Sequence, residues 1–147
     1  MLFRSKTQVQ ILRLGHVYGP GENEYKKIIP ITIAKLKQGV HPQIWGNGTE
    51  KRSFIYVDDV IRVISKAIDS NVIATPVNVV SGGSLSVNEL IKLLIKVSGL
   101  PDEPEYIGVS TSPRNLEFDN RKMKEFYCDE VYSLEEGLRL EWEHAIA

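Results

Sequence analysis

The chain of 147 residues is long enough to form one domain with a buried core. Its 18 basic and 19 acidic side chains give a net charge of −1, so electrostatics favours neither nucleic acid nor an anionic membrane as the main partner. A single cysteine, Cys128, excludes an internal disulfide framework and predicts a reducing, cytoplasmic compartment. No stretch approaches the roughly 18 apolar residues that cross a bilayer.

The first predicted element is a buried strand over residues 9–14, a short apolar run with β-branched side chains. It leads into a loop with the sequence Tyr18-Gly19-Pro20-Gly21. A strand that opens a domain usually has a partner upstream, and almost nothing precedes this one. The sequence therefore predicts a truncated chain, in which residues 1–7 are a scar or the remnant of the N-terminal part and residues 8–147 are the domain that is present.

Two helices are expected next. Proline is favoured in a first helical turn, so the first helix is placed near Pro30, and Gly39 suits a left-handed cap at its end. Asn47-Gly48 is a turn signal between two apolar runs, at a spacing wider than a tight hairpin. Asp58 or Asp59 is expected to cap the second helix. The predicted apolar faces contain Ile29, Ile33 and Leu36 in the first helix, and Val60, Val63, Ile64, Ala67 and Ile68 in the second.

The rest of the chain continues the alternation of strands and helices. A strand is predicted over residues 77–80, and short strands are expected near residues 105–107 and 115–118. A capping box, Ser86-x-x-Glu89, begins a helix that ends at Gly99. A second box, Ser133-x-x-Glu136, begins the last helix. This alternation predicts an α/β or α+β fold.

Two linked motifs carry a family resemblance. The first is Leu-Arg-Leu-Gly-His-Val-Tyr-Gly-Pro-Gly at residues 12–21, and the second is Ile-Trp-Gly-Asn-Gly-Thr-Glu-Lys-Arg-Ser-Phe-Ile-Tyr-Val-Asp-Asp at residues 44–59. Together they resemble the C-terminal half of a sugar-nucleotide epimerase/dehydratase of the extended short-chain dehydrogenase family. The resemblance extends over residues 8–145. It implies an α/β fold made of the last Rossmann strands and a small mixed α/β substrate-binding domain.

The resemblance also implies the ligands. This half would bind a nucleotide diphosphate sugar, and NAD or NADP would be held mainly by the other half, with His16 and Leu14 near the cofactor. Many relatives have asparagine at the position of His16, and a histidine there would carry a charge that varies near neutral pH. A homodimer is one expectation for the full-length protein.

Arg52 is the main candidate for the phosphates, because its planar fork donates two parallel hydrogen bonds and stays charged. In an alternating strand, Phe54 points the same way as Arg52. The resemblance places Gln43 and Trp45 against the base, where the indole could stack. The alternatives are a solvated arginine at a sheet edge and a tryptophan in the core.

Two further cations are secondary candidates. Lys27 precedes a predicted helix, whose N-terminus is favourable for an anion, and a solvent-facing lysine is the alternative. Arg114 lies in a Pro-Arg-x-x-x-x-Asp pattern that resembles the GDP-fucose synthase-like branch of the family. The alternative for Arg114 is a loop arginine paired with Asp119 or Glu117.

The motifs that perform catalysis in this family are missing from the sequence. It contains neither a Tyr-x-x-x-Lys pair nor a Gly-x-x-Gly-x-x-Gly loop, so no catalytic residue is assigned and the chain alone is expected to be inactive. The adjacent carboxylates of Asp58 and Asp59 are better explained as a helix cap than as acid/base machinery. His16, His41 and His144 lack metal-ligand spacing, and no metal site is predicted.

The function implied by these motifs is that of an NAD(P)-dependent sugar-nucleotide epimerase/dehydratase. Two alternatives remain open, a GDP-fucose synthase-like epimerase-reductase and a non-catalytic module that binds nucleotide sugars. A third is a complete small protein that binds nucleotides or a partner by itself.

Overall fold

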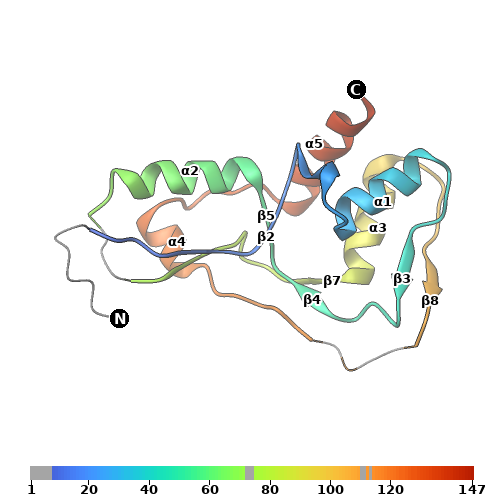
Figure 1. The fold of residues 1–147 in the computed structure, drawn as a ribbon, viewed down its shortest axis with the longest axis horizontal. Helices are drawn as coiled ribbons and strands as arrows, with labels where there is room; N and C mark the ends of the chain where they lie inside the picture. The colour runs from blue at the N-terminus through green and yellow to red at the C-terminus, as the bar shows by residue number, and fades with distance from the viewer. Residues whose placement is uncertain (1–7, 72–74, 110–111, 113) are drawn as a thin grey trace.

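The computed structural model describes residues 8–71, 75–109, 112 and 114–147. Figure 1 shows α2 and α4 at one end of the molecule, and α1, α3, β3 and β8 at the other. The elements are β1 (Leu12–Leu14), β2 (His16–Tyr18), a 3₁₀ helix η1 (Glu22–Glu24), α1 (Ile28–Lys37), β3 (Gln43–Trp45), β4 (Lys51–Arg52), β5 (Phe54–Tyr56), α2 (Val57–Ile68), β6 (Val77–Val79), β7 (Leu85–Ser86), α3 (Val87–Ser98), β8 (Glu105–Ile107), α4 (Arg121–Phe126) and α5 (Leu134–Ile146).

The first extended segment of the chain pairs with two different strands in turn. β1 is parallel to β6, and β2 is parallel to β5. The change of partner falls at Gly15, whose N–H donates to the carbonyl of Val79, while the next N–H, that of His16, donates to the carbonyl of Ser53. A Cβ on Gly15 would lie 2.5 Å from Cγ1 of Val80, so a glycine fits where the three strands meet.

The Asn47-Gly48 turn forms, but it does not join a hairpin. β3 pairs in parallel with β8, β4 pairs antiparallel with β7, and β5 pairs with β2. The turn instead contacts the start of α3, because the N–H of Asn88 donates to the carbonyl of Gly48 and its side chain donates to the carbonyl of Asn47. The two apolar runs on either side of the turn thus belong to different strand pairs.

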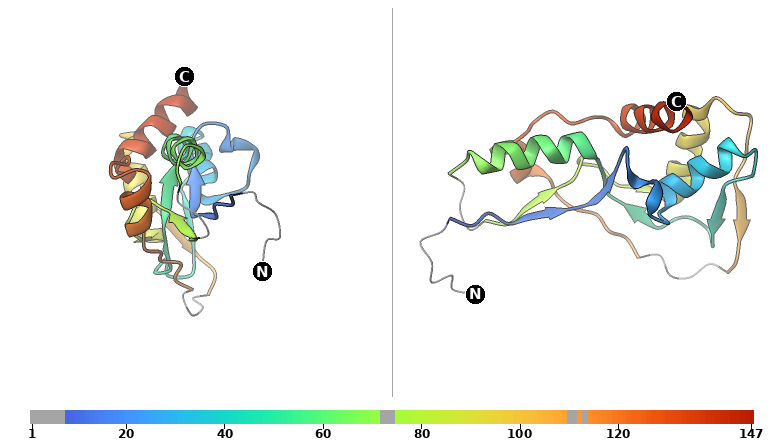
Figure 2. Two further views of the ribbon diagram at one scale, coloured as in Figure 1. Left: turned by 90° about the vertical axis from the view of Figure 1, so that its left-hand side faces the viewer. Right: turned by 45° about the horizontal axis from the view of Figure 1, so that its top comes forward.

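Two apolar clusters stabilise the two ends of the molecule. One lies between the strands β2 and β5 and the helices α1, α3 and α5, and the other lies between β1, β5, β6, α2 and α4. The right-hand view in Figure 2 shows α1 and α3 together at the end of the molecule away from α4. The buried members of the first cluster include Ile29, Ile33, Leu36, Leu90, Leu94, Leu138 and Trp142, and those of the second include Val60, Val63, Ala67, Val77 and Val79.

Most predicted helix ends are confirmed. Gly39 and Gly99 follow α1 and α3 with positive φ, and both capping boxes form, at Ser86 and at Ser133. The predicted cap at Asp58 or Asp59 is wrong, because α2 begins at Val57, after Tyr56, and no side chain caps it.

The structure assigns Asp59 a different role. Its carboxylate is completely buried, pairs with Arg62 and accepts the N–H of Tyr132 at 3.1 Å. It therefore connects α2 to the segment that leads into α5.

The predicted strands differ in extent. The run at residues 9–14 is a strand only from Leu12. The strand expected at residues 115–118 is reduced to a single bridge between Leu116 and Arg52. The interpretation of residues 1–7 lies outside the described residues. Within the described part of the chain, no helix has the length and apolar character needed to span a bilayer.

Candidate functional site

Two adjoining cavities lie where β2, β4 and β5 meet the starts of α1 and α3. The first cavity, of about 300 Å³, is lined by parts of these elements together with η1. The second cavity, of about 280 Å³, lies between the loop after β3, β4 and the segment that follows β8. Arg52 and Glu50 line both cavities, so the two adjoin at these residues and together make up the candidate site.

Arg52 is held at the junction of the two cavities. Its Nη1 donates to the carbonyl of Lys51 at 2.9 Å and to the carbonyl of Arg114. Among the described residues, no acceptor is bound to its Nη2 or Nε. Because Phe54 lines the first cavity too, the predicted common face of Arg52 and Phe54 is present, although Ser53 separates β4 from β5. The guanidinium is therefore oriented by the backbone and keeps free donors for an anion.

Lys27 adds a second positive charge to the first cavity. It is the N-cap residue of α1, and its Nζ lies 2.8 Å from Oε1 of Glu22 and 3.5 Å from the carbonyl of Val17. The side chain is half exposed, in agreement with the alternative of a solvent-facing lysine, but it is tethered by Glu22. Its position at a helix N-terminus favours an anion.

His16 lies in the same cavity, with its ring 5.4 Å from the ring of Phe54. Burial lowers the pKa of His16 below its usual value, and the charges of Arg52 and Lys27 lower it further, against an opposing hydrogen bond to the backbone of Ser53. The folded protein therefore favours the neutral form of the imidazole.

Glu22 and Glu50 are cavity residues that the sequence analysis did not single out. Glu22 is buried, its Oε2 has no partner among the residues that the structure describes, and burial raises its pKa against the lowering effect of Lys27. Glu50 precedes Arg52 by two residues, so the strand alternation that pairs Arg52 with Phe54 would have found it. Nothing local in the sequence indicates that Glu22 is buried.

Trp45 lines the second cavity and is 74% exposed, so the core alternative is wrong. Its indole lies against Gly108, where an added Cβ would be 2.8 Å from Cε3 of the ring. Gly108 also has a φ of +74°, which disfavours other residues. The ring is thus supported by backbone at β8 and remains accessible for stacking.

Arg114 also lines the second cavity. The alternative, an ion pair with Glu117 or Asp119, is not found in the described part of the structure, where Glu117 contacts Ser84 and Lys51, and Asp119 pairs with Arg121. Arg114 therefore contributes a carbonyl that orients Arg52 and a charged side chain beside it.

Two candidates lie away from the cavities. Gln43 accepts a hydrogen bond from Lys35 at 2.6 Å and donates one to Glu105 at 2.8 Å, so its amide is occupied by neighbouring surface residues. Leu14 is 49% exposed on β1 and lines neither cavity.

The described residues do not provide a dinucleotide-binding loop. The glycines after β2 lead into the three-residue helix η1 rather than into an α-helix N-terminus that could receive a pyrophosphate. Within the same described segments, no group of three or more His, Cys, Asp or Glu side chains is arranged to hold a metal ion.

Comparison with known proteins shows what the chain is similar to. The chain is 33% identical over 99 residues to dTDP-4-dehydro-6-deoxy-D-allose reductase of Streptomyces bikiniensis, covering 65% of this chain and 30% of the relative. The structure of UDP-glucose 4-epimerase from Thermotoga maritima with UDP-glucose matches with a TM-score of 0.83 and 31% identity, over 95% of this chain and 46% of that one.

A second solved structure, UDP-glucuronic acid 4-epimerase of Bacillus cereus in complex with UDP-glucuronic acid and NAD, matches with a TM-score of 0.78 and 27% identity, over 92% of this chain and 44% of that one. The chain thus spans less than half the length of these relatives. The match to solved epimerases confirms the predicted α/β fold.

The family model for NAD-dependent epimerases and dehydratases matches residues 4–80, which include β1 to β6 and the candidate residues Lys27, Trp45 and Arg52. This chain belongs to the NAD-dependent epimerase/dehydratase family.

Proposed function

We propose that residues 8–147 form the nucleotide-sugar-binding half of an NAD(P)-dependent sugar-nucleotide epimerase or dehydratase. The observation that carries the proposal is the pair of cavities joined at Arg52, with positive charge in both and an exposed tryptophan in the second. A nucleotide diphosphate sugar needs these features, namely cations for the pyrophosphate and a flat apolar surface for the base.

The residues have distinct roles in this proposal. The free N–H groups of Arg52 bind the pyrophosphate, and Lys27 and Arg114 add charge on either side of it. Trp45 stacks on the base, and the apolar wall formed by Phe54 and its neighbours covers the sugar side.

Hydride chemistry belongs to the nicotinamide, which this half does not hold by itself, since it has neither the glycine-rich loop nor the Tyr-x-x-x-Lys pair. The role of this chain is to bind, orient and cover the substrate. The cofactor, NAD or NADP, would be held by a further part of the whole protein, for which a homodimer is proposed.

A reductase is the second candidate, favoured by the 33% identity to a dTDP-sugar reductase. Both candidates require the same nucleotide-sugar site. They differ in what happens to the sugar after binding, which depends on catalytic residues outside this sequence.

The test is calorimetric titration of the chain with a panel of UDP-, dTDP- and GDP-sugars. We expect at least one to bind, and Arg52→Ala to weaken the tightest complex about 10-fold or more, because a charge-assisted hydrogen bond contributes about 1.5–3 kcal/mol. Arg13→Ala is the matched control, since Arg13 is an exposed arginine on β1 outside both cavities. Equal losses in the two variants, or unchanged affinity in Arg52→Ala, would refute the proposed site.

A further inference from the structure

Glu50 is the carboxylate at the junction of the two cavities. It lines both of them, as does Arg52, and its side chain has no hydrogen bond or ion pair within the described residues. The backbone around it is fixed, because its carbonyl accepts the N–H of Val87 at 3.1 Å and the next N–H, that of Lys51, donates to the side chain of Asn115 at 3.0 Å. The carboxylate is therefore presented to the site from an anchored segment.

The chemistry of Glu50 restricts what can bind there. An ionised carboxylate only accepts hydrogen bonds, so it repels a phosphate and favours a group that donates. Two hydroxyl groups on neighbouring carbons suit it best, because each can donate to one of the two carboxylate oxygens. Such a vicinal diol is the feature that distinguishes ribose from 2′-deoxyribose.

The order of the residues along the site places a ribose at Glu50. Trp45 lies in the second cavity only, Lys27 lies in the first cavity only, and Glu50 and Arg52 lie between them. In a nucleotide diphosphate sugar, the ribose lies between the base and the pyrophosphate. A base on Trp45 and a pyrophosphate on Arg52 and Lys27 would leave the ribose beside Glu50.

We infer that Glu50 accepts hydrogen bonds from the 2′ and 3′ hydroxyls of the nucleotide ribose, and so selects ribonucleoside over 2′-deoxyribonucleoside diphosphates. The inference rests on the proposed function, since it uses the same site. The inferred preference for ribose distinguishes this chain from the reductase that shares 33% identity with it, because the substrate named for that reductase carries the deoxynucleotide dTDP.

The experiment compares nucleotides that differ only in the 2′ hydroxyl. The chain is titrated with UDP and dUDP, and with GDP and dGDP, so that the comparison does not depend on which base is preferred. We expect the ribonucleotide to bind at least about 10-fold more tightly than its deoxy counterpart, because this is the effect of one hydrogen bond to a charged group. In Glu50→Ala, the ratio should fall to near one.

The ratio of the two affinities is the readout because it cancels the effect of charge on the phosphates. Removing a carboxylate near the pyrophosphate strengthens both nucleotides alike, whereas losing the diol contact weakens only the ribonucleotide. Glu50→Gln, which preserves the size of the side chain and one acceptor oxygen, should retain part of the preference for the ribonucleotide. Glu125→Ala, at an exposed position on α4, should keep the wild-type ratio.

Two results would overturn the inference. Equal affinity of the wild-type chain for UDP and dUDP, and for GDP and dGDP, would exclude a ribose contact while leaving the nucleotide site intact. A wild-type preference for ribose that persists in Glu50→Ala would assign the selection to another residue. If none of the four nucleotides binds and Arg52→Ala has no effect on the sugar nucleotides, the proposed function itself fails.

Discussion

At the scale of single residues, His16 combines a half-buried ring with two cations in the same cavity. Burial and those cations lower its pKa, so the free protein favours the neutral ring. A bound pyrophosphate would raise the pKa of His16 again, because its negative charges favour the imidazolium. Ligand binding and protonation of His16 are therefore coupled.

The coupling predicts that the affinity for a sugar nucleotide rises as the pH falls. For UDP-glucose, whose pyrophosphate diester does not titrate in this range, we expect the complex to tighten about threefold or more between pH 7.5 and pH 5.5. Glu22, whose pKa is raised by burial, contributes in the same direction. His16→Asn should reduce the pH dependence and leave the part due to Glu22. Calorimetry at the two pH values measures the affinity of each protein for UDP-glucose. The same pH dependence in the variant as in the wild type would exclude His16 as its cause.

The sequence was sufficient for some of these residues and not for others. Arg52 and Trp45 belong to a contiguous motif, and they line the cavities that the structure contains. Gln43 directly precedes this motif, but a lysine on α1 and a glutamate on β8 occupy its amide, and both come from other parts of the chain. Glu22 lies in the cavity only because η1 turns back against α1, which no local pattern predicts.

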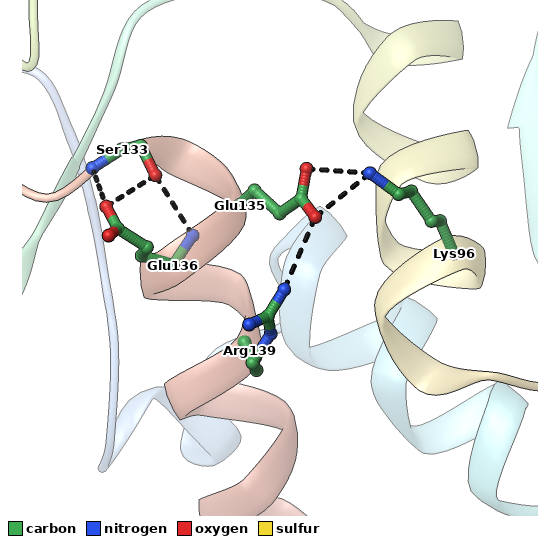
Figure 3. A network of polar contacts seen from close by, with 5 residues as sticks. All are labelled: Lys96, Ser133, Glu135, Glu136 and Arg139. Carbon is green, nitrogen blue, oxygen red and sulfur yellow. Dashed lines mark hydrogen bonds and ion pairs between the residues drawn. The ribbon is translucent and has the colours of Figure 1, made fainter.

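At the scale of elements, the start of α5 contains two kinds of polar contact (Figure 3). Inside the helix start, the hydroxyl of Ser133 accepts the N–H of Glu136, and the Glu136 carboxylate accepts the N–H of Ser133 at 2.9 Å. On the surface, Glu135 pairs with Lys96 of α3 at 2.9 Å and with Arg139 at 3.4 Å. The first contact satisfies N–H groups of the first turn that have no partner within the helix, and the second joins exposed charges that water screens.

This difference predicts unequal effects on stability. Ser133→Ala should lower the Tm by about 2–4 °C, because it leaves a helix N-terminus uncapped. Lys96→Ala should change the Tm much less, since the ion pair is exposed. Ser133→Thr, which keeps a hydroxyl, serves as the control. Thermal unfolding followed by circular dichroism measures all three, and a larger loss in Lys96→Ala than in Ser133→Ala would contradict the argument.

The capping boxes also show which elements can be predicted. Both boxes and both glycine caps were predicted correctly, because each signal lies within a few residues of the structure that it specifies. The pairing of strands was not predicted, because β1 pairs with β6 and β3 pairs with β8, and the partners lie far apart in the chain. The Asp59 carboxylate was misassigned for the same reason, since one of its partners is Tyr132.

At the scale of the whole molecule, Glu141 lies where α5 packs on the rest of the protein. It is 1% exposed, and its Oε2 has no partner in the described part of the chain. Burial raises its pKa, the nearby charge of Glu22 raises it further, and His144 opposes the shift. Burial is the main cause that raises the pKa values of Tyr18 and Tyr56, and the charge of Glu141 adds to it.

A raised pKa in the folded state means that the folded protein binds protons more tightly than the unfolded chain. The stabilising effect of this proton is present below the unfolded pKa and is lost as the pH rises through the folded pKa. Glu141→Gln should therefore raise the Tm by about 2–4 °C at pH 7.5 and give no gain near pH 4. The control is Glu143→Gln, at an exposed position on the same helix. An equal gain at both pH values would disprove a role for ionisation.

The pairing of the strands has a consequence for how quickly the chain can fold. Leu12 pairs with Val77, His16 with Phe54, Gln43 with Glu105 and Lys51 with Ser86, and none of these pairs is a hairpin. Each pair requires a long loop to close before its hydrogen bonds can form, so the contact order is high. The chain therefore loses conformational entropy before the hydrogen bonds compensate for it. The helices with their local caps can form first, and strand pairing then limits the rate of folding.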